Sequence, residues 1–220
     1  MTRTVLRPLW PRHVREAGRE DTAAAQVTTD DDLIRAVLRG NDQVTAELYR
    51  RLYPTVDRTL CRIFGGRDRD HEDLVQNAFE QIISTIASSK FNRSCSLATW
   101  ASAVTTKVGL AALRSRCRER NLVDRSGRID PTKLADLSFY EIDRQLGARD
   151  MIQKLHAVLS NMSSHRAEVL FLHDVAGLEL SEIAVLIGDS ESAVQSRLVR
   201  GRRELMAKLS LLDESGGALS

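Results

Sequence analysis

The segment from Gly177 to Leu205 constrains the fold more than any other, because its apolar residues repeat at helical spacing on both sides of Gly188. The positions predicted to face inward are Ile183, Ala184, Ile187, Val194, Leu198, Gly201 and Leu205. Steps of three and four residues indicate two amphipathic helices. Ser181 is predicted to cap the first and Asp189 or Ser190 the second. With the glycine between them, the pattern predicts a helix-turn-helix.

The outer faces of the second predicted helix carry groups that suit nucleic acid. They are Gln195, Ser196, Val199, Arg200 and Arg203. Amides, hydroxyls and guanidinium groups can recognise base edges in a major groove, while other arginines neutralise phosphates. The alternative is an ordinary helical hairpin whose basic face is simply solvated. We expect DNA binding, since the turn and the polar face occur together.

Helical patterns continue through most of the chain, and proline occurs only four times. Long alternations of β-branched and aromatic residues are missing, which also favours helices over strands. Helices are predicted over about 33–38, 42–64, 70–88, 97–118, 148–160, 164–175, 180–187 and 190–210. The fold class is therefore predicted to be all-α, with two small helical domains joined by a flexible linker.

The domain boundaries follow from where these patterns stop. Residues 1–29 lack periodicity and are predicted to be a disordered extension. The first domain is expected at 30–118 with four helices, and the second at 148–210 with the helix-turn-helix. Gly127, Pro131 and mixed polarity mark 119–147 as the linker, and 211–220 as a tail.

Composition limits the possible functions. The net charge is only +2, so the placement of charge is more informative than its total. Arginines crowd one stretch near 114–128 and another near 197–203, which suggests two contacts with polyanions unless both are solvated faces. Three cysteines without CxxC spacing fit a reducing cytoplasm, and no apolar run has the length of a membrane helix. We expect no membrane insertion.

Chemistry-bearing motifs are few. His71 and Glu72 begin like a zinc-protease motif, but Val75 stands where its second histidine belongs. His156, His165 and His173 lack the spacing of a common metal site. Aromatic residues make up only 5% of the chain, which argues against an aromatic-lined ligand pocket. We therefore expect no enzyme activity, no catalytic residues, no metal and no cofactor.

The second domain resembles region four of bacterial sigma factors, especially the extracytoplasmic-function group. The resemblance is carried by Arg166 to Leu170, Gly177-Leu178, Glu182 to Ala184, Leu186 to Gly188, and Ala193 to Arg202. It implies binding to the upstream promoter element by Ser192, Gln195, Ser196, Arg197, Val199, Arg200 and Arg203, and contact with the polymerase β flap. Ser192, Ala193 and Gln195 replace the family's usual Gly, Thr and Lys, which bears on the promoter sequence rather than the role.

The first domain carries a second resemblance, to sigma region two. The segment Asp70 to Phe79 is similar to the helix by which sigma factors hold the β′ clamp of core RNA polymerase, with Asn77 in place of the family's final Glu. An acidic helix start with an exposed Gln can pair with arginines of a partner. The residues implied in polymerase binding are Asp70, Asp73, Leu74, Gln76, Asn77 and Glu80. Taken alone, the same segment would be an ordinary acidic helix start.

The segment from Phe91 to Arg114 resembles the part of region two that recognises and opens the downstream promoter element, and Arg114, Arg116, Arg118 and Arg120 match the basic helix end of the family. The residues implied in that contact are Phe91, Asn92, Arg93, Ser96, Trp100, Lys107, Arg114, Arg116 and Arg118. Unpairing bases costs a few kcal/mol each, which a protein pocket and a backbone clamp must offset. Trp100 is expected to lie in the core rather than to act as a melting wedge.

Together the resemblances cover about residues 30–210 and imply a cytoplasmic sigma factor that binds core RNA polymerase and promoter DNA, held by an anti-sigma factor. The rival is a helix-turn-helix regulator that acts as a dimer without core polymerase. A third option is an enzyme or metal protein built on a helical bundle, and only scattered His and Cys residues support it. The linker would average roughly 30 Å end to end and reach about 90 Å when stretched. Because the promoter elements lie ~70 Å apart, the linker can span this distance but cannot set it.

Overall fold

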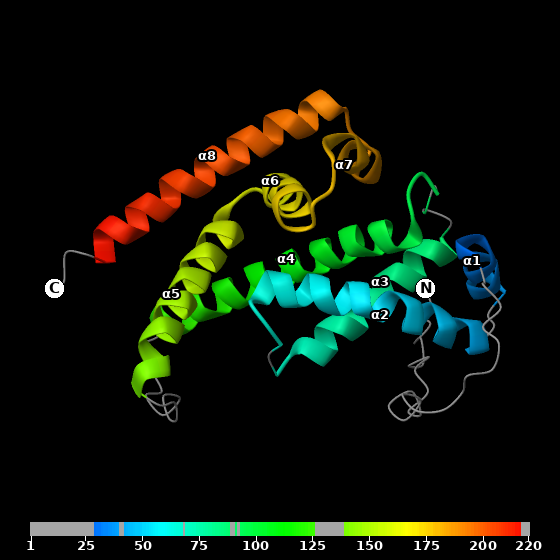
Figure 1. The fold of residues 1–220 in the computed structure, drawn as a ribbon, viewed down its shortest axis with the longest axis horizontal. Helices are drawn as coiled ribbons and strands as arrows, with labels where there is room; N and C mark the ends of the chain where they lie inside the picture. The colour runs from blue at the N-terminus through cyan, green and yellow to red at the C-terminus, as the bar shows by residue number, and fades with distance from the viewer. Residues whose placement is uncertain are drawn as a thin grey trace. The chain divides into compact units, whose positions relative to one another are not determined.

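The computed structural model describes residues 29–39, 42–67, 69–88, 91, 93–125 and 139–216. Every regular element in these ranges is helical, which confirms the predicted all-α class (Figure 1). The chain divides into two compact units, Met1–Arg51 and Leu52–Ser220, which are described separately. The predicted extension over residues 1–28 and much of the predicted linker lie outside the described residues. None of the helices in the described ranges has the length and apolar character needed to cross a membrane.

The first unit contains α1 (Asp30–Leu38) and the beginning of α2 (Asp42–Phe64). Thr29 caps α1: its hydroxyl accepts the N–H of Asp32 at 3.2 Å, and the Asp32 carboxylate accepts the N–H of Thr29 at 3.3 Å. This reciprocal pair satisfies donors that a helix start leaves open. Leu33, Ile34 and Leu48 are buried.

The second unit opens with the rest of α2, followed by α3 (His71–Ala87) and α4 (Leu97–Arg125). The predicted apolar stripe of α3 is buried as expected, at Leu74, Ala78, Phe79, Ile82 and Ile86. Helix α4 continues beyond the predicted end near residue 118 and ends at Arg125. The physical reason is that no Gly or Pro interrupts it before Gly127.

Five further helical elements complete the second unit. They are α5 (Phe139–Asn161), α6 (Ser164–Leu170), the π-helix η3 (Phe171–Val175), α7 (Leu180–Ile187) and α8 (Glu191–Gly216). The helix predicted over 164–175 thus has the expected extent but changes winding at Phe171. Helix α5 begins earlier, and α8 ends later, than the apolar patterns alone predicted.

The core of the second unit joins α4 to the later helices. One buried cluster contains Ala103, Val169, Leu172, Ile183, Ala184, Val194 and Leu198. A second contains Leu110, Leu113, Val158, Leu159, Met162, Ala167 and Leu170. Because Ala103, Leu110 and Leu113 belong to α4, this helix contributes to both clusters, and its inward face lies against α5 and α6.

Candidate nucleic-acid interface

The turn between α7 and α8 is built as the sequence predicted. Gly188 adopts a left-handed conformation with φ of 72°, where most residues with a Cβ are strained. The N–H of Asp189 donates to the carbonyl of Ala184 at 2.9 Å. The Ser190 hydroxyl accepts the N–H of Ala193 at 3.3 Å, so Ser190 caps α8. Figure 1 shows the two helices joined directly by this turn.

The start of α7 differs from the prediction. Glu179, rather than Ser181, is the capping residue, and its N–H donates to the Glu182 carboxylate at 2.9 Å. Glu179 has extended backbone, with φ −72° and ψ 154°, while Leu180 is already helical. Ser181 therefore lies inside the helix, where its hydroxyl cannot fill the role that the sequence suggested.

Helix α8 buries the predicted face. Val194 and Leu198 are 0% and 4% exposed, and Gly201 is also buried. A Cβ added at Gly201 would lie 3.5 Å from Leu170 Cδ1, so the glycine marks a close approach of α8 to α6. This packing fixes which residues of α8 point outward.

The outward face of α8 gathers the groups proposed to read DNA. Five side chains line one open concavity: Gln195, Ser196, Val199, Arg200 and Arg203. Val199, an apolar residue, is 50% exposed on this face. The concavity thus offers an amide, a hydroxyl, a methyl-bearing side chain and two guanidinium groups, the kinds of group that contact bases and phosphates in a major groove.

The arginines of α8 fall into two classes. Arg197 lies 2.5 Å from the Asp189 carboxylate in the turn, and Arg202 is paired with Asp174 of η3. These guanidinium groups hold the pKa values of Asp189 and Asp174 below their usual range by hydrogen bonding. Among the described residues, Arg200 and Arg203 take part in no ion pair. Arg197, which the sequence placed in the DNA set, therefore braces the turn.

Ser192, the first predicted reader, is exposed at the start of α8. Its hydroxyl lies 3.2 Å from that of Ser190, the capping residue. Ser192 would therefore contact DNA from the N-terminal end of α8, beside the capping residue Ser190.

Helix α3 presents a polar face opposite its buried stripe. Asp73, Gln76, Asn77 and Glu80 are exposed along it, and the Gln76 amide donates to the Glu80 carboxylate at 3.1 Å. Asp70, just before the helix, lies 3.2 Å from an Arg116 nitrogen of α4. Leu74 is only 6% exposed and packs in the core, so its predicted contact with polymerase stays a prediction.

The residues predicted at the downstream promoter element do not form one exposed set. Phe91 and Trp100 are each 9% exposed, with ring centroids 4.8 Å apart. Ser96 caps α4, because its hydroxyl accepts the N–H of Thr99 at 3.0 Å. Arg93 is exposed, with φ of 58°. Asn92 lies outside the described residues.

The basic residues of α4 lie in different environments. Lys107 Nζ is 3.4 Å from Glu168 Oε1 of α6. Arg114 has a buried nitrogen without a hydrogen bond, and burial lowers its pKa, with the nearby Glu168 acting in the opposite direction. Arg116 stacks 4.5 Å above the Phe64 ring, while Arg118 is exposed.

Sequence reasoning missed two features. Glu168 is 8% exposed and faces α4, a placement that its polar character does not suggest. Asp57, Cys61 and His71 bring ligand atoms within 4.8 Å of one another. The i, i+4 spacing of Asp57 and Cys61 was visible, since it puts both on one helix face. The approach of His71 depends on the packing of α3 against α2 and had no local signal.

Comparisons with known proteins match both parts of the chain. The family model "Sigma-70 region 2" matches residues 48–119, and "Sigma-70, region 4" matches residues 152–205. The curated RNA polymerase sigma factor NccH of Alcaligenes xylosoxydans xylosoxydans is 27% identical over 186 residues, covering 83% of this chain and 95% of that protein. The ECF RNA polymerase sigma factor SigE of Mycolicibacterium smegmatis is 28% identical over 161 residues, covering 72% and 59%.

Two solved structures are also similar. CnrH, in complex with the cytosolic domain of CnrY, has a TM-score of 0.47 and 21% identity, covering 83% of this chain and 96% of that one. The sigma factor RpoE of Bartonella quintana, in complex with the anti-sigma factor NepR, has a TM-score of 0.42 and 19% identity, covering 74% and 95%.

Proposed function

This chain belongs to the sigma-70 family, as a sigma factor of the extracytoplasmic-function group that directs transcription initiation, and we propose how its surfaces divide that work. The outward face of α8 reads the upstream promoter element. The exposed face of α3 binds the β′ clamp of core RNA polymerase. Residues of α4 and of the segment before it contact the downstream promoter element.

For the upstream element, the proposal assigns different roles to neighbouring residues of α8. Gln195, Ser196 and Arg200 make base contacts, with Val199 available for a thymine methyl group. Arg203 lies one turn from Val199 and neutralises a phosphate. Arg197 holds the turn through Asp189, and so positions the helix.

For core polymerase, the proposal uses Asp73, Gln76, Asn77 and Glu80, with Asp70 at the helix start. The carboxylate of Asp70 lies just before α3 and that of Asp73 lies in its first turn, where the helix dipole favours negative charge. Such a face is complementary to arginines on a partner helix. The β flap is the proposed partner of the segment matched by the region-four model.

For the downstream element, the exposed basic candidates are Arg93, Lys107 and Arg118. Lys107 is exposed although it pairs with Glu168 of α6, whereas Arg114 is half-buried near the same carboxylate and would be released if α6 moved away from α4. Phe91 and Trp100 support the loop from within the core.

Membership of the group also supports an anti-sigma factor as a regulatory partner and the cytoplasm, where polymerase works, as the location. The chain itself would have no enzyme activity, since sigma-70 factors act by directing the polymerase.

The main observation behind the assignment of DNA reading to α8 is its concavity, where Arg200 and Arg203 take part in no ion pair with the described residues.

The polymerase-binding surface of α3 is tested by a pull-down of core RNA polymerase with the double variant Asp73→Ala, Gln76→Ala. We expect loss of core binding with the fold intact. The matched control is Gln81→Ala on α3, at an exposed position outside the proposed set. Retention of core by the double variant would refute the assignment.

A further inference from the structure

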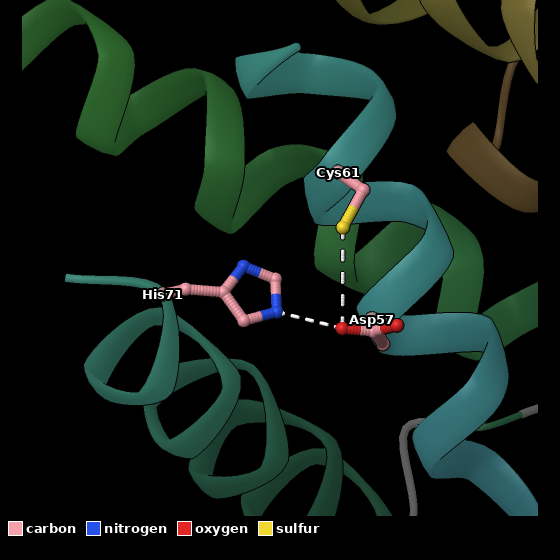
Figure 2. A group of neighbouring side chains, drawn as sticks. All are labelled: Asp57, Cys61 and His71. Atoms are coloured by element: carbon pink, nitrogen blue, oxygen red, sulfur yellow. Dashed lines mark hydrogen bonds and ion pairs between the residues drawn. The ribbon is translucent and has the colours of Figure 1, made fainter. Parts of the chain in front are cut away.

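Three side chains of different chemistry converge between α2 and α3. Asp57 and Cys61 lie one turn apart on α2, and His71 is the first residue of α3. His71 Nε2 lies 2.7 Å from Asp57 Oδ1, and Cys61 Sγ lies 4.0 Å from the same oxygen. Figure 2 shows the imidazole and the thiol both directed at this carboxylate.

The donor set suits a transition metal. A carboxylate oxygen, an imidazole nitrogen and a sulfur are the ligands that Zn²⁺ takes in proteins, at bond lengths of about 2.0–2.3 Å. Tetrahedral bonds of that length separate the ligand atoms by roughly 3.3–3.6 Å. All three ligand atoms lie within 4.8 Å of one another. To reach a common ion, the widest separation would have to shorten by about 1 Å, and the 2.7 Å contact between His71 and Asp57 would have to lengthen by about half an ångström.

A cation already occupies this carboxylate. Arg67 donates from Nε and Nη2 to the two oxygens of Asp57, at 2.9 and 2.8 Å, and holds the pKa of Asp57 below its usual range. The Arg67 side chain is 59% exposed, whereas that of His71 is 4% exposed. The exposed arginine can therefore leave for solvent while the histidine stays in place.

We propose that Asp57, Cys61 and His71 form a zinc site with its fourth position open to water, for which Arg67 is the competing cation. Zn²⁺ would replace the charge of Arg67 at the carboxylate and take Cys61 as thiolate, releasing its proton to solvent. The bound ion would tie the start of α3 to α2. Asp73 and Gln76 follow within two turns, so metal occupancy would steady the face proposed for core polymerase.

The test uses Co²⁺ as a spectroscopic probe on the full chain, followed by Zn²⁺ in competition with a chromophoric chelator. We expect one equivalent of Co²⁺ with a thiolate charge-transfer band, displaced by Zn²⁺. Cys61→Ser and His71→Gln should each weaken metal binding by about tenfold or more. The matched control is Cys117→Ser, a half-buried cysteine of α4 that is not among these ligands.

Arg67→Ala is a second test that keeps all three ligands, so it applies even if a ligand variant fails to fold. It removes the guanidinium that competes with the metal for Asp57. A metal site predicts tighter Zn²⁺ binding and a raised urea midpoint in the presence of zinc. A purely structural network predicts a lowered midpoint that zinc does not restore. That second result, or a charge-transfer band that persists in Cys61→Ser, would overturn the proposal.

Discussion

Arginines that lie close together on α8 differ in whether they have a carboxylate partner. Arg202 is engaged by Asp174, whereas Arg200, two positions earlier, faces the open concavity with Gln195 and Ser196. Composition gives both the same charge, and helical spacing alone does not show which has a carboxylate partner. The structure separates an arginine paired with a carboxylate, Arg202, from one that lines the open concavity, Arg200.

Arg200→Ala should cost roughly 1–3 kcal/mol in binding of the holoenzyme to its own upstream element, because a bidentate contact with a base is lost. The measurement is binding of holoenzyme to a promoter and to a version with the upstream element substituted. Arg202→Ala is the control, expected to affect stability and not promoter choice. An equal loss on both promoters would make Arg200 a phosphate contact instead.

Acid should weaken the pairing of η3 with α8. Hydrogen bonds from Arg202 lower the pKa of Asp174. A carboxyl with a lowered folded pKa stabilises the fold above its unfolded pKa, about 3.9, and loses this as pH falls through the folded value. Asp174→Asn should therefore lower the urea midpoint at neutral pH, with the difference shrinking below about pH 4. A difference that stays constant into that range would contradict the assignment.

At the scale of elements, local chemistry predicted where helices form better than where they end. The apolar stripe of α3 is buried as predicted, and that of α8 is buried at Val194, Leu198 and Gly201 and partly buried at Leu205, because periodicity reports which face packs. One of the two predicted helix caps is confirmed, because Ser190 caps α8. The other is wrong, because Glu179 caps α7 in place of Ser181. Several polar residues lie near the start of α7, and the sequence alone does not show which of them is the cap. The end of α4 at Arg125 escaped prediction because basic residues at 114–120 resemble a helix terminus.

Ser96 provides an element-scale test, because it was predicted to contact DNA and is observed to cap α4. Ser96→Ala should destabilise the fold by about 1 kcal/mol, the usual cost of removing such a cap. Urea unfolding measures this, and Ser96→Asp is the matched control expected to keep the cap. A variant of native stability that loses only downstream-element binding would favour the DNA role.

Gly188 tests the turn between α7 and α8. An added Cβ would meet no atom within 4 Å, so the cost of Gly188→Ala is conformational alone. We expect a loss of about 1–2 kcal/mol, the usual penalty for a left-handed residue with a Cβ. Gly188→Asn should lose less, since Asn tolerates this region. Equal stability of all three proteins in urea would show that the turn does not demand a glycine.

At the scale of the whole molecule, the contact between α4 and α6 must be temporary if both matched segments work on one promoter. Lys107 and Glu168 are 3.4 Å apart, whereas promoter elements two helical turns apart are separated by ~70 Å. The structure also shortens the predicted linker, because α4 ends at Arg125 and α5 begins at Phe139. Residues 126–138 between them can contribute at most about 45 Å, so the two matched segments must themselves span the rest of the ~70 Å between the promoter elements.

Opening of α4 from α6 can be followed with spin labels introduced at the exposed Ser84 of α3 and Ser210 of α8. Core polymerase should lengthen the distance between the labels, because it holds the two segments over separate promoter elements. The free protein is the reference, and Glu168→Gln should shift it toward the longer distance. An unchanged distance in the holoenzyme would contradict this opening.

The central claim is that two helical segments grip nucleic acid weakly and become one selective reader when docked on core polymerase. Promoter affinity of the purified chain, measured with and without core enzyme at the same salt concentration, tests it most directly. We predict weak, salt-sensitive binding by the chain alone and a specific complex with core, because tethering multiplies two modest contacts. Equal affinity for the promoter in both cases would contradict the account.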